Sequence, residues 1–181
     1  MDNSALILID IQRDYFADGA FPLPTMQDAA ENAVKVLTNF RKQKLPIWHI
    51  QHIEHDPSGS FFLPDSEGAK IHQSVLPIDG ERLIVKHYPN SFRDTALLKE
   101  LHIRGIHKII FCGAMSNMCV DATVRAAFDF GFECTVVHDA CAASEMEFNG
   151  KHLGSEDVQA AFMGSLGSAY AQVIDCAALC E

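Results

Sequence analysis

The stretch KIIFCGAMSNMCVDATVRAAFDF, residues 108–130, decides the fold class of this chain. Its opening segment, Lys108–Cys112, is β-prone and almost wholly apolar, which is typical of a parallel strand covered on both faces. A short turn with Gly113 follows, and residues 117–130 then carry apolar side chains at helical spacing. A buried strand that leads through a turn into an amphipathic helix is the building unit of a parallel α/β sheet.

The same unit recurs along the chain. Strands are expected at Ala5–Ile9, Pro46–Ile50, Leu83–Lys86, Lys108–Cys112, Cys134–Val137 and Gln172–Ile174. Helices are expected at Met26–Lys42, Thr95–Leu101, Asn117–Phe130 and Ser155–Leu166, and Gly105, Gly131 and Gly167 are interpreted as glycines that end three of them. With 181 residues, the sequence predicts a single domain over 1–181 with a three-layer α/β/α, Rossmann-like architecture and a six-stranded, mainly parallel sheet.

Composition narrows the class of protein. Hydrophobic residues make up 48% and charged residues 21%, as in ordinary globular domains, and the formal net charge is −10. No basic cluster is present, which argues against a nucleic-acid partner, and no apolar run approaches the about 18 residues of a membrane span. Without a signal-peptide pattern, a cytoplasmic location is expected, and the six cysteines are interpreted as thiols, most of them buried.

Two segments do not fit the strand–helix pattern. Residues 52–81 form a long irregular stretch, and loops of this length in a compact domain are often functional. Residues 146–153 are interpreted as a polar connection.

Three reactive side chains fall where α/β sheets bind ligands, beyond the carboxyl ends of the strands. Asp10 ends the first strand, Lys86 ends the third, and Cys119 lies in the first turn of the helix after the fourth. That position and a nearby ammonium would lower the pKa of the Cys119 thiol, and Asp10 could take the thiol proton. Each residue alone has an ordinary structural interpretation, as a core cysteine, a turn aspartate or a solvated lysine, so the inference depends on their joint placement.

Histidines and aromatic residues supply weaker signals. His52, with His55 and with Asp56 or His72, could assemble a metal site, but nine histidines make chance clustering easy, and no metal is predicted. Aromatic side chains in irregular segments suit the wall of a small apolar pocket, and we expect Phe16, Phe62, Tyr88 and Phe92 to contact a small-molecule substrate.

Four motifs in order resemble the isochorismatase-like cysteine hydrolase superfamily, which includes nicotinamidases and N-carbamoylsarcosine amidohydrolases. They are LIDIQRDYF at 8–16, KHYPNSF at 86–92, GAMSNMCVDATVRAA at 113–127 and DACA at 139–142, and they span nearly the whole chain. The resemblance implies a catalytic triad of Asp10, Lys86 and Cys119. It also implies a cis peptide bond between Ala114 and Met115, an oxyanion hole from the backbone N–H groups of Met115 and Cys119, no cofactor, and a homo-oligomer.

The implied strand order is 3-2-1-4-5-6. It places the third strand two positions from the first, so Lys86 must lean across the end of the second strand, or that strand must stop early. Metal-binding nicotinamidases carry an Asp-x-His pair after the second strand, and the Asp is absent from HIQHIEH at 49–55. True isochorismatases typically lack the nucleophilic cysteine that Cys119 supplies.

The sequence therefore predicts hydrolysis of a C–N bond in a small amide or ureido substrate through a covalent thioester. Hydrolysis of a non-amide bond, as by an isochorismatase, remains an alternative, as does a non-catalytic role in small-molecule binding or redox sensing. A dinucleotide-binding protein is disfavoured, because Asp10-Ile11-Gln12 stands where a glycine-rich loop would follow the first strand.

Overall fold

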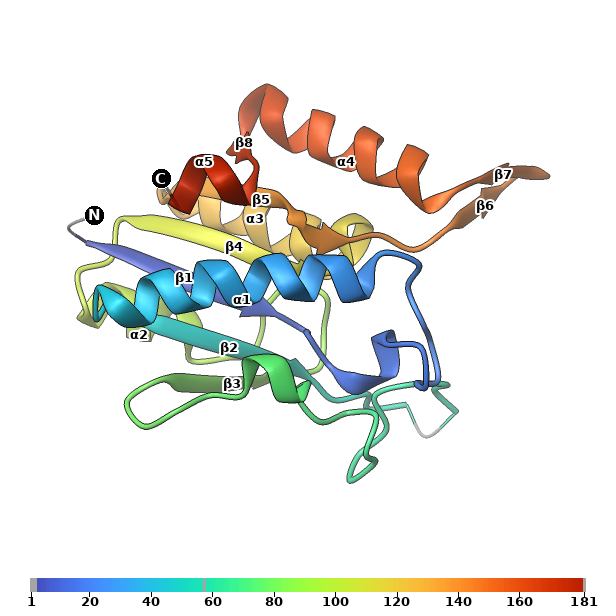
Figure 1. The fold of residues 1–181 in the computed structure, drawn as a ribbon, viewed down its shortest axis with the longest axis horizontal. Coiled ribbons are helices and arrows are strands. Elements are labelled where there is room, and N and C mark those ends of the chain that lie inside the picture. Colours follow the sequence, from blue (N-terminus) through green and yellow to red (C-terminus); the bar gives the residue numbers. More distant parts are fainter. Residues whose placement is uncertain (1–2, 57, 181) are drawn as a thin grey trace.

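The computed structural model describes residues 3–56 and 58–180, which form a six-stranded sheet flanked by helices and a separate two-stranded hairpin (Figure 1). The strands are β1 (Ser4–Ile9), β2 (Ile47–His52), β3 (Arg82–Lys86), β4 (Lys108–Ala114), β5 (Glu133–Ala142), β6 (Met146–Phe148), β7 (Lys151–Leu153) and β8 (Gln172–Ile174). The α-helices are α1 (Met26–Lys42), α2 (Leu97–Ile103), α3 (Asp121–Asp129), α4 (Ser155–Ala169) and α5 (Cys176–Cys180). Short helical turns are η1 (Arg13–Tyr15), η2 (Gln73–Val75) and η3 (Ser116–Val120).

Six strands pair in the order β3-β2-β1-β4-β5-β8, and every pair is parallel. The predicted three-layer α/β fold and its strand order are confirmed, with β8 as the sixth strand. The order reverses direction between β1 and β4, and side chains at the carboxyl ends of these two strands therefore face the crevice where α/β sheets bind ligands.

Both faces of the sheet are covered, which explains why its strands are continuously apolar. Alternate residues of β1 enter two different cores: Leu6 and Leu8 pack with α1, whereas Ile7 and Ile9 pack with α2 and α3. In Figure 1, α1 and α5 lie over one face of the sheet, and α2 and α3 lie behind it. No helix within the described residues is long and apolar enough to cross a membrane.

Several expected boundaries differ from the observed ones. The helix expected at Thr95–Leu101 is α2, Leu97–Ile103, and β5 continues to Ala142, five residues beyond its expected end. Gly105 and Gly131 follow helices with φ of +63° and +89°, but Gly167 lies inside α4. A β-carbon at Gly167 would be 3.4 Å from Val173 Cγ2, an ordinary van der Waals distance, so this glycine lies against β8 within the helix and does not end it.

The interpretation of residues 146–153 as a polar connection was wrong. Strands β6 and β7 pair antiparallel as a hairpin that extends away from the main sheet (Figure 1). Its turn is Asn149-Gly150, and both residues have positive φ, +51° and +75°. Asn-Gly is favoured in two-residue hairpin turns because both residues tolerate this conformation.

Candidate active site

The structure brings Asp10, Lys86 and Cys119 into direct contact. Lys86 Nζ lies 2.7 Å from Asp10 Oδ2 and 3.2 Å from Cys119 Sγ. Asp10 and Lys86 have no exposed surface, and Cys119 is 5% exposed. Because buried charges in proteins are normally paired, the Asp10–Lys86 contact explains how both side chains can lie inside the core.

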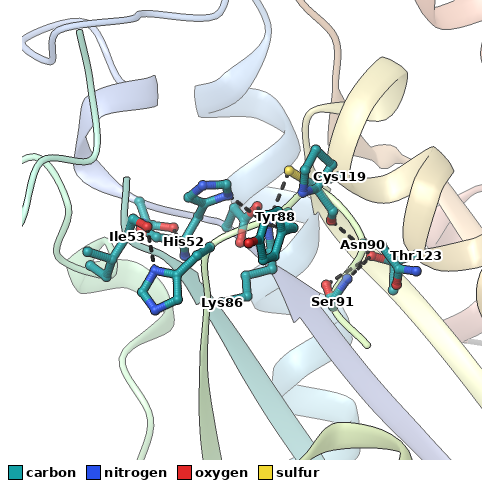
Figure 2. Close-up of polar contacts among 12 residues, drawn as sticks. His52, Ile53, Lys86, Tyr88, Asn90, Ser91, Cys119 and Thr123 are labelled. Carbon is teal, nitrogen blue, oxygen red and sulfur yellow. Dashed lines mark hydrogen bonds and ion pairs between the residues drawn. The ribbon is translucent and has the colours of Figure 1, made fainter. Parts of the chain in front are cut away.

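Lys86 reaches Asp10 by leaning across the end of β2. Strand β2 does not stop early, since His52 is paired with Lys86 in the register of β2 and β3. The Lys86 ammonium passes the His52 ring, whose Nδ1 is 2.9 Å away, and contacts the carboxylate beyond β1. In Figure 2, side chains from β2, β3 and the turn after β4 converge on this ammonium.

Asp10 follows β1 in a left-handed conformation, with φ of +49°. Its backbone N–H donates to the Ile50 carbonyl on β2, which fixes the turn. Its carboxylate is fully buried, and among the described residues Oδ1 has no hydrogen-bond partner. Asp10 therefore keeps one acceptor oxygen for a proton that arrives within the site.

The Cys119 turn departs from a regular helix start. The peptide bond between Ala114 and Met115 is cis, and η3 is a π-helical turn that precedes α3. The carbonyl of Met115 accepts hydrogen bonds from the N–H groups of Met118 and Val120, which wraps the chain around Cys119. Gly113, with φ of +127°, allows the close approach to β1: a β-carbon there would be 1.9 Å from the Ile9 carbonyl oxygen.

The protonation of the site differs from the sequence-based expectation of a lowered thiol pKa. Burial raises the pKa of Cys119 well above its ordinary value, the Asp10 charge raises it further, and the opposing effect of Lys86 is smaller. Burial lowers the pKa of Lys86, but Asp10 and Cys119 reverse this effect, and the net pKa is raised. Burial thus favours the protonated thiol beside the Asp10–Lys86 contact.

His52 is a site residue that sequence reasoning placed elsewhere. Its ring lies with Asp10 and Cys119, with one potential ligand atom from each within 4.8 Å of the others. The Lys86 ammonium contacts all three side chains, so a lysine cation occupies the position that a metal would need. The only signal in the sequence was the position of His52 at the end of a buried strand.

The other residues of the hypothetical metal site are not gathered around His52. His55 stacks on His87, with ring centroids 3.7 Å apart, and His72 stacks on Phe16 at 3.7 Å. Asp56 accepts hydrogen bonds from Ser58. The described residues therefore do not assemble this set of ligands.

The four aromatic residues expected at the substrate separate into two groups. Phe62 is buried with its ring centroid 5.9 Å from that of His52, and the Tyr88 carbonyl accepts a hydrogen bond from Lys86. Phe16 packs on His72, and Phe92 packs in the core against Phe130 and Phe132. The Phe62 ring and the Tyr88 backbone carbonyl thus lie at the Lys86–His52 cluster, whereas the Tyr88 ring packs against the Arg93 guanidinium, 3.6 Å from its centroid.

Hydrogen bonds hold the segments that flank the site. Buried Ser91 donates its backbone N–H to Thr123 Oγ1 at 3.0 Å, which ties the chain after Lys86 to α3 (Figure 2). Asn117 donates to Ser144 Oγ at 3.0 Å, which ties the Cys119 turn to the chain after β5.

Comparisons with known proteins agree with this architecture. The Isochorismatase domain model matches residues 4–176. An uncharacterised isochorismatase family protein of Bacillus subtilis, YddQ, is 45% identical over 94% of each chain. The crystal structure of a hydrolase from Oleispira antarctica, described as an isochorismatase hydrolase, has a TM-score of 0.95 and 47% identity, and the match covers 99% of this chain and 97% of that one.

A more distant relative has a more specific name. Nicotinamidase 3 of Arabidopsis thaliana is 25% identical, over 96% of this chain and 85% of its own. Since the family model covers nearly the whole chain and close relatives share its full length, the chain belongs to the isochorismatase family of hydrolases.

Proposed function

We propose that this protein is a cysteine hydrolase that cleaves a C–N bond of a small amide or ureido substrate through a thioester. The observation that carries the proposal is the contact of one buried ammonium, Lys86, with both a carboxylate and a thiol at 2.7 Å and 3.2 Å. A thiol, a base and a cation within contact distance are the parts that nucleophilic catalysis at a carbonyl requires.

The first half of the reaction forms the acyl-enzyme. Asp10 takes the proton of the Cys119 thiol, and the thiolate attacks the substrate carbonyl carbon. The backbone N–H groups of Met115 and Cys119 are proposed to bind the oxyanion that forms. When this intermediate collapses, the C–N bond breaks, and protonated Asp10 gives its proton to the departing ammonia or amine.

The second half releases the acid product. A water molecule attacks the thioester while Asp10 accepts one of its protons. The C–S bond then breaks, and the proton returns from Asp10 to the Cys119 sulfur. Asp10 thus acts as base and then acid in each half of the reaction, which suits a carboxylate with an open buried oxygen.

The amide class of substrate has two supports. A thiol nucleophile is suited to reactions in which an acyl group passes through a thioester intermediate. The relative named nicotinamidase is, by that name, an amidase, and it aligns over nearly the whole chain.

The test is ammonia release from a panel of small primary amides and ureido compounds. The wild-type protein and the matched control Cys134→Ala should release ammonia, because Cys134 is a buried thiol outside the site. Cys119→Ala should be inactive, since members of a catalytic triad act as a unit. Turnover that persists in Cys119→Ala would refute the covalent scheme, and hydrolysis of other bonds without ammonia release would assign a non-amide substrate.

A further inference from the structure

The Lys86 ammonium has more acceptors around it than hydrogens to give. Its Nζ lies 2.7 Å from Asp10 Oδ2, 2.9 Å from His52 Nδ1, 3.1 Å from the Tyr88 carbonyl oxygen and 3.2 Å from Cys119 Sγ. A lysine ammonium carries three N–H donors. Four acceptors therefore compete for three hydrogens, and at any moment one acceptor lacks a full hydrogen bond from Lys86.

The four acceptors belong to two kinds. The Tyr88 carbonyl never changes charge. Burial and the adjacent Lys86 charge lower the pKa of His52, so its ring is neutral near pH 7 and Nδ1 accepts while the ring proton lies on Nε2. Asp10 and Cys119, in contrast, exchange a proton during the proposed reaction, so negative charge moves from one to the other.

His52 is held in place by the buried side chain of Gln12, which also donates to the Ala69 carbonyl at 2.7 Å. Gln12 is fully buried, and its Oε1 accepts from the His52 N–H at 2.7 Å while its Nε2 donates to the His52 carbonyl at 2.8 Å. Both polar groups of the His52 backbone are thus clamped by one amide. Such a second layer of hydrogen bonds is how proteins fix the orientation of a functional side chain.

The surroundings of His52 favour the neutral ring from several elements. The titratable groups that face it are Lys86 from β3, Asp10 from the end of β1, Cys119 from η3, and Glu54 and His87 from flanking segments. Lys86 and His87 disfavour a second positive charge on the ring, whereas Asp10 and Glu54 favour it. Burial has the largest effect, and it disfavours the charged ring.

We propose that His52 is a positioning residue that, together with the Tyr88 carbonyl, anchors two N–H groups of Lys86 and leaves the third to be shared between Asp10 and Cys119. The inference rests on the proposed function and deepens it. Before proton transfer, the shared N–H points to the Asp10 carboxylate. Once the Cys119 proton has moved to Asp10, the negative charge lies on sulfur, and the same N–H turns to Cys119 while the ammonium stays in place.

The consequence of losing the anchor follows from the count of hydrogens. Without Nδ1, Lys86 has three acceptors for three hydrogens, so it can serve the Asp10 carboxylate and the Cys119 sulfur at the same time. The thiolate should then form more readily without Asp10 becoming protonated. Asp10 would consequently be protonated in a smaller fraction of molecules. It could then supply the leaving nitrogen with a proton less often, and turnover should fall.

The experiment measures the rate at which Cys119 reacts with iodoacetamide at one fixed pH below the pKa of the thiol, which needs no knowledge of the substrate. The full chain is used in a Cys180→Ser background, because Cys180 is the exposed cysteine. Labelling of Cys119 is quantified by mass spectrometry in parallel with turnover of the amide found in the panel above. Three substitutions are compared: His52→Phe removes the acceptor, His52→Asn restores one close to Nδ1, and His55→Phe is a matched histidine that does not contact Lys86.

In His52→Phe we expect the rate of Cys119 labelling at fixed pH to rise about tenfold, and kcat to fall about 10- to 100-fold, the size of one hydrogen bond to a charged group. His52→Asn should recover both quantities, and His55→Phe should resemble wild type. A labelling rate that stays unchanged or falls in His52→Phe would overturn the proposal, as would His52→Asn behaving like His52→Phe. A failure of the proposed function is distinguishable, because it would silence the amide assay while the labelling rates still respond to His52.

Discussion

Replacing Lys86 with methionine tests how much the buried Asp10–Lys86 ion pair contributes to the stability of the protein. Methionine keeps the length of the side chain but removes the ammonium. The Asp10 carboxylate would then remain fully buried, with neither oxygen hydrogen-bonded among the described residues. Breaking a buried pair by removing one partner costs about 3–5 kcal/mol, because the other charge is left uncompensated.

The expected loss of stability can be converted to a change in melting temperature. For a chain of 150–250 residues, 1 kcal/mol corresponds to about 2–4 °C in Tm, so Lys86→Met should lower Tm by roughly 6–20 °C. Asp10→Asn should lower it for the complementary reason, since it leaves the ammonium unpaired. The double variant Asp10→Asn/Lys86→Met removes both charges and should be more stable than the sum of the single losses predicts.

The assay is a double-mutant cycle of thermal and urea unfolding, with Lys108→Met as the control. Lys108 pairs with Glu133 at 2.8 Å, but both side chains are more than half exposed, so its loss should cost no more than about 1 kcal/mol. Two results would refute the reasoning: a Lys86→Met protein as stable as wild type, or a double variant whose loss equals the sum of the single losses.

Three further predictions concern stability. First, Glu81 has a pKa lowered to about 2, where burial opposes the shift and Arg41 and His49 produce it. Its contribution to stability is therefore present above pH 4.5 and lost as pH falls toward 2, and acid unfolding of Glu81→Gln should lack this part of the pH dependence. Second, burial raises the pKa of Cys134 and Cys141 to about 12. The unfolded chain thus loses thiol protons first, and urea unfolding should show stability falling as pH rises above 9. Third, Gly113→Ala should lower Tm sharply or prevent folding, whereas Gly80→Ala, which meets no neighbouring atom, should cost only the strain of its positive φ.

The sheet and its reactive edge were predictable because local signals and topology agree. Apolar strands, interrupted by amphipathic helices, fix a parallel sheet, and a parallel sheet brings all strand carboxyl ends to one edge. Asp10, Lys86 and Cys119 could therefore be expected near one another without any knowledge of side-chain conformation. Their contact distances could not, because the sequence leaves open whether Lys86 leans across the end of β2 or β2 stops early, and the observed register and contact with His52 decide for the first.

Other features could not be predicted from the sequence, for identifiable physical reasons. The Asn149-Gly150 turn was readable in principle, but its flanking strands are three residues each and too short to show alternation. The raised pKa of Cys119 depends on complete burial, which spacing does not reveal. The role of His52 depends on its clamp by Gln12, forty positions earlier, and a contact so distant in sequence leaves no local pattern.

Burial of the site makes a protonated thiol compatible with the proposed nucleophilic chemistry. A free thiolate at this depth would add a net negative charge to a core that holds only the Asp10–Lys86 pair and a neutral imidazole. Passing the Cys119 proton to Asp10 instead moves the negative charge by one contact and leaves the net charge of the site unchanged. The free-energy cost of forming a buried thiolate is thus offset because a buried carboxylate beside the same ammonium becomes neutral. In the proposed reaction the thiolate forms by this proton transfer, and the raised pKa of Cys119 favours the protonated thiol before it.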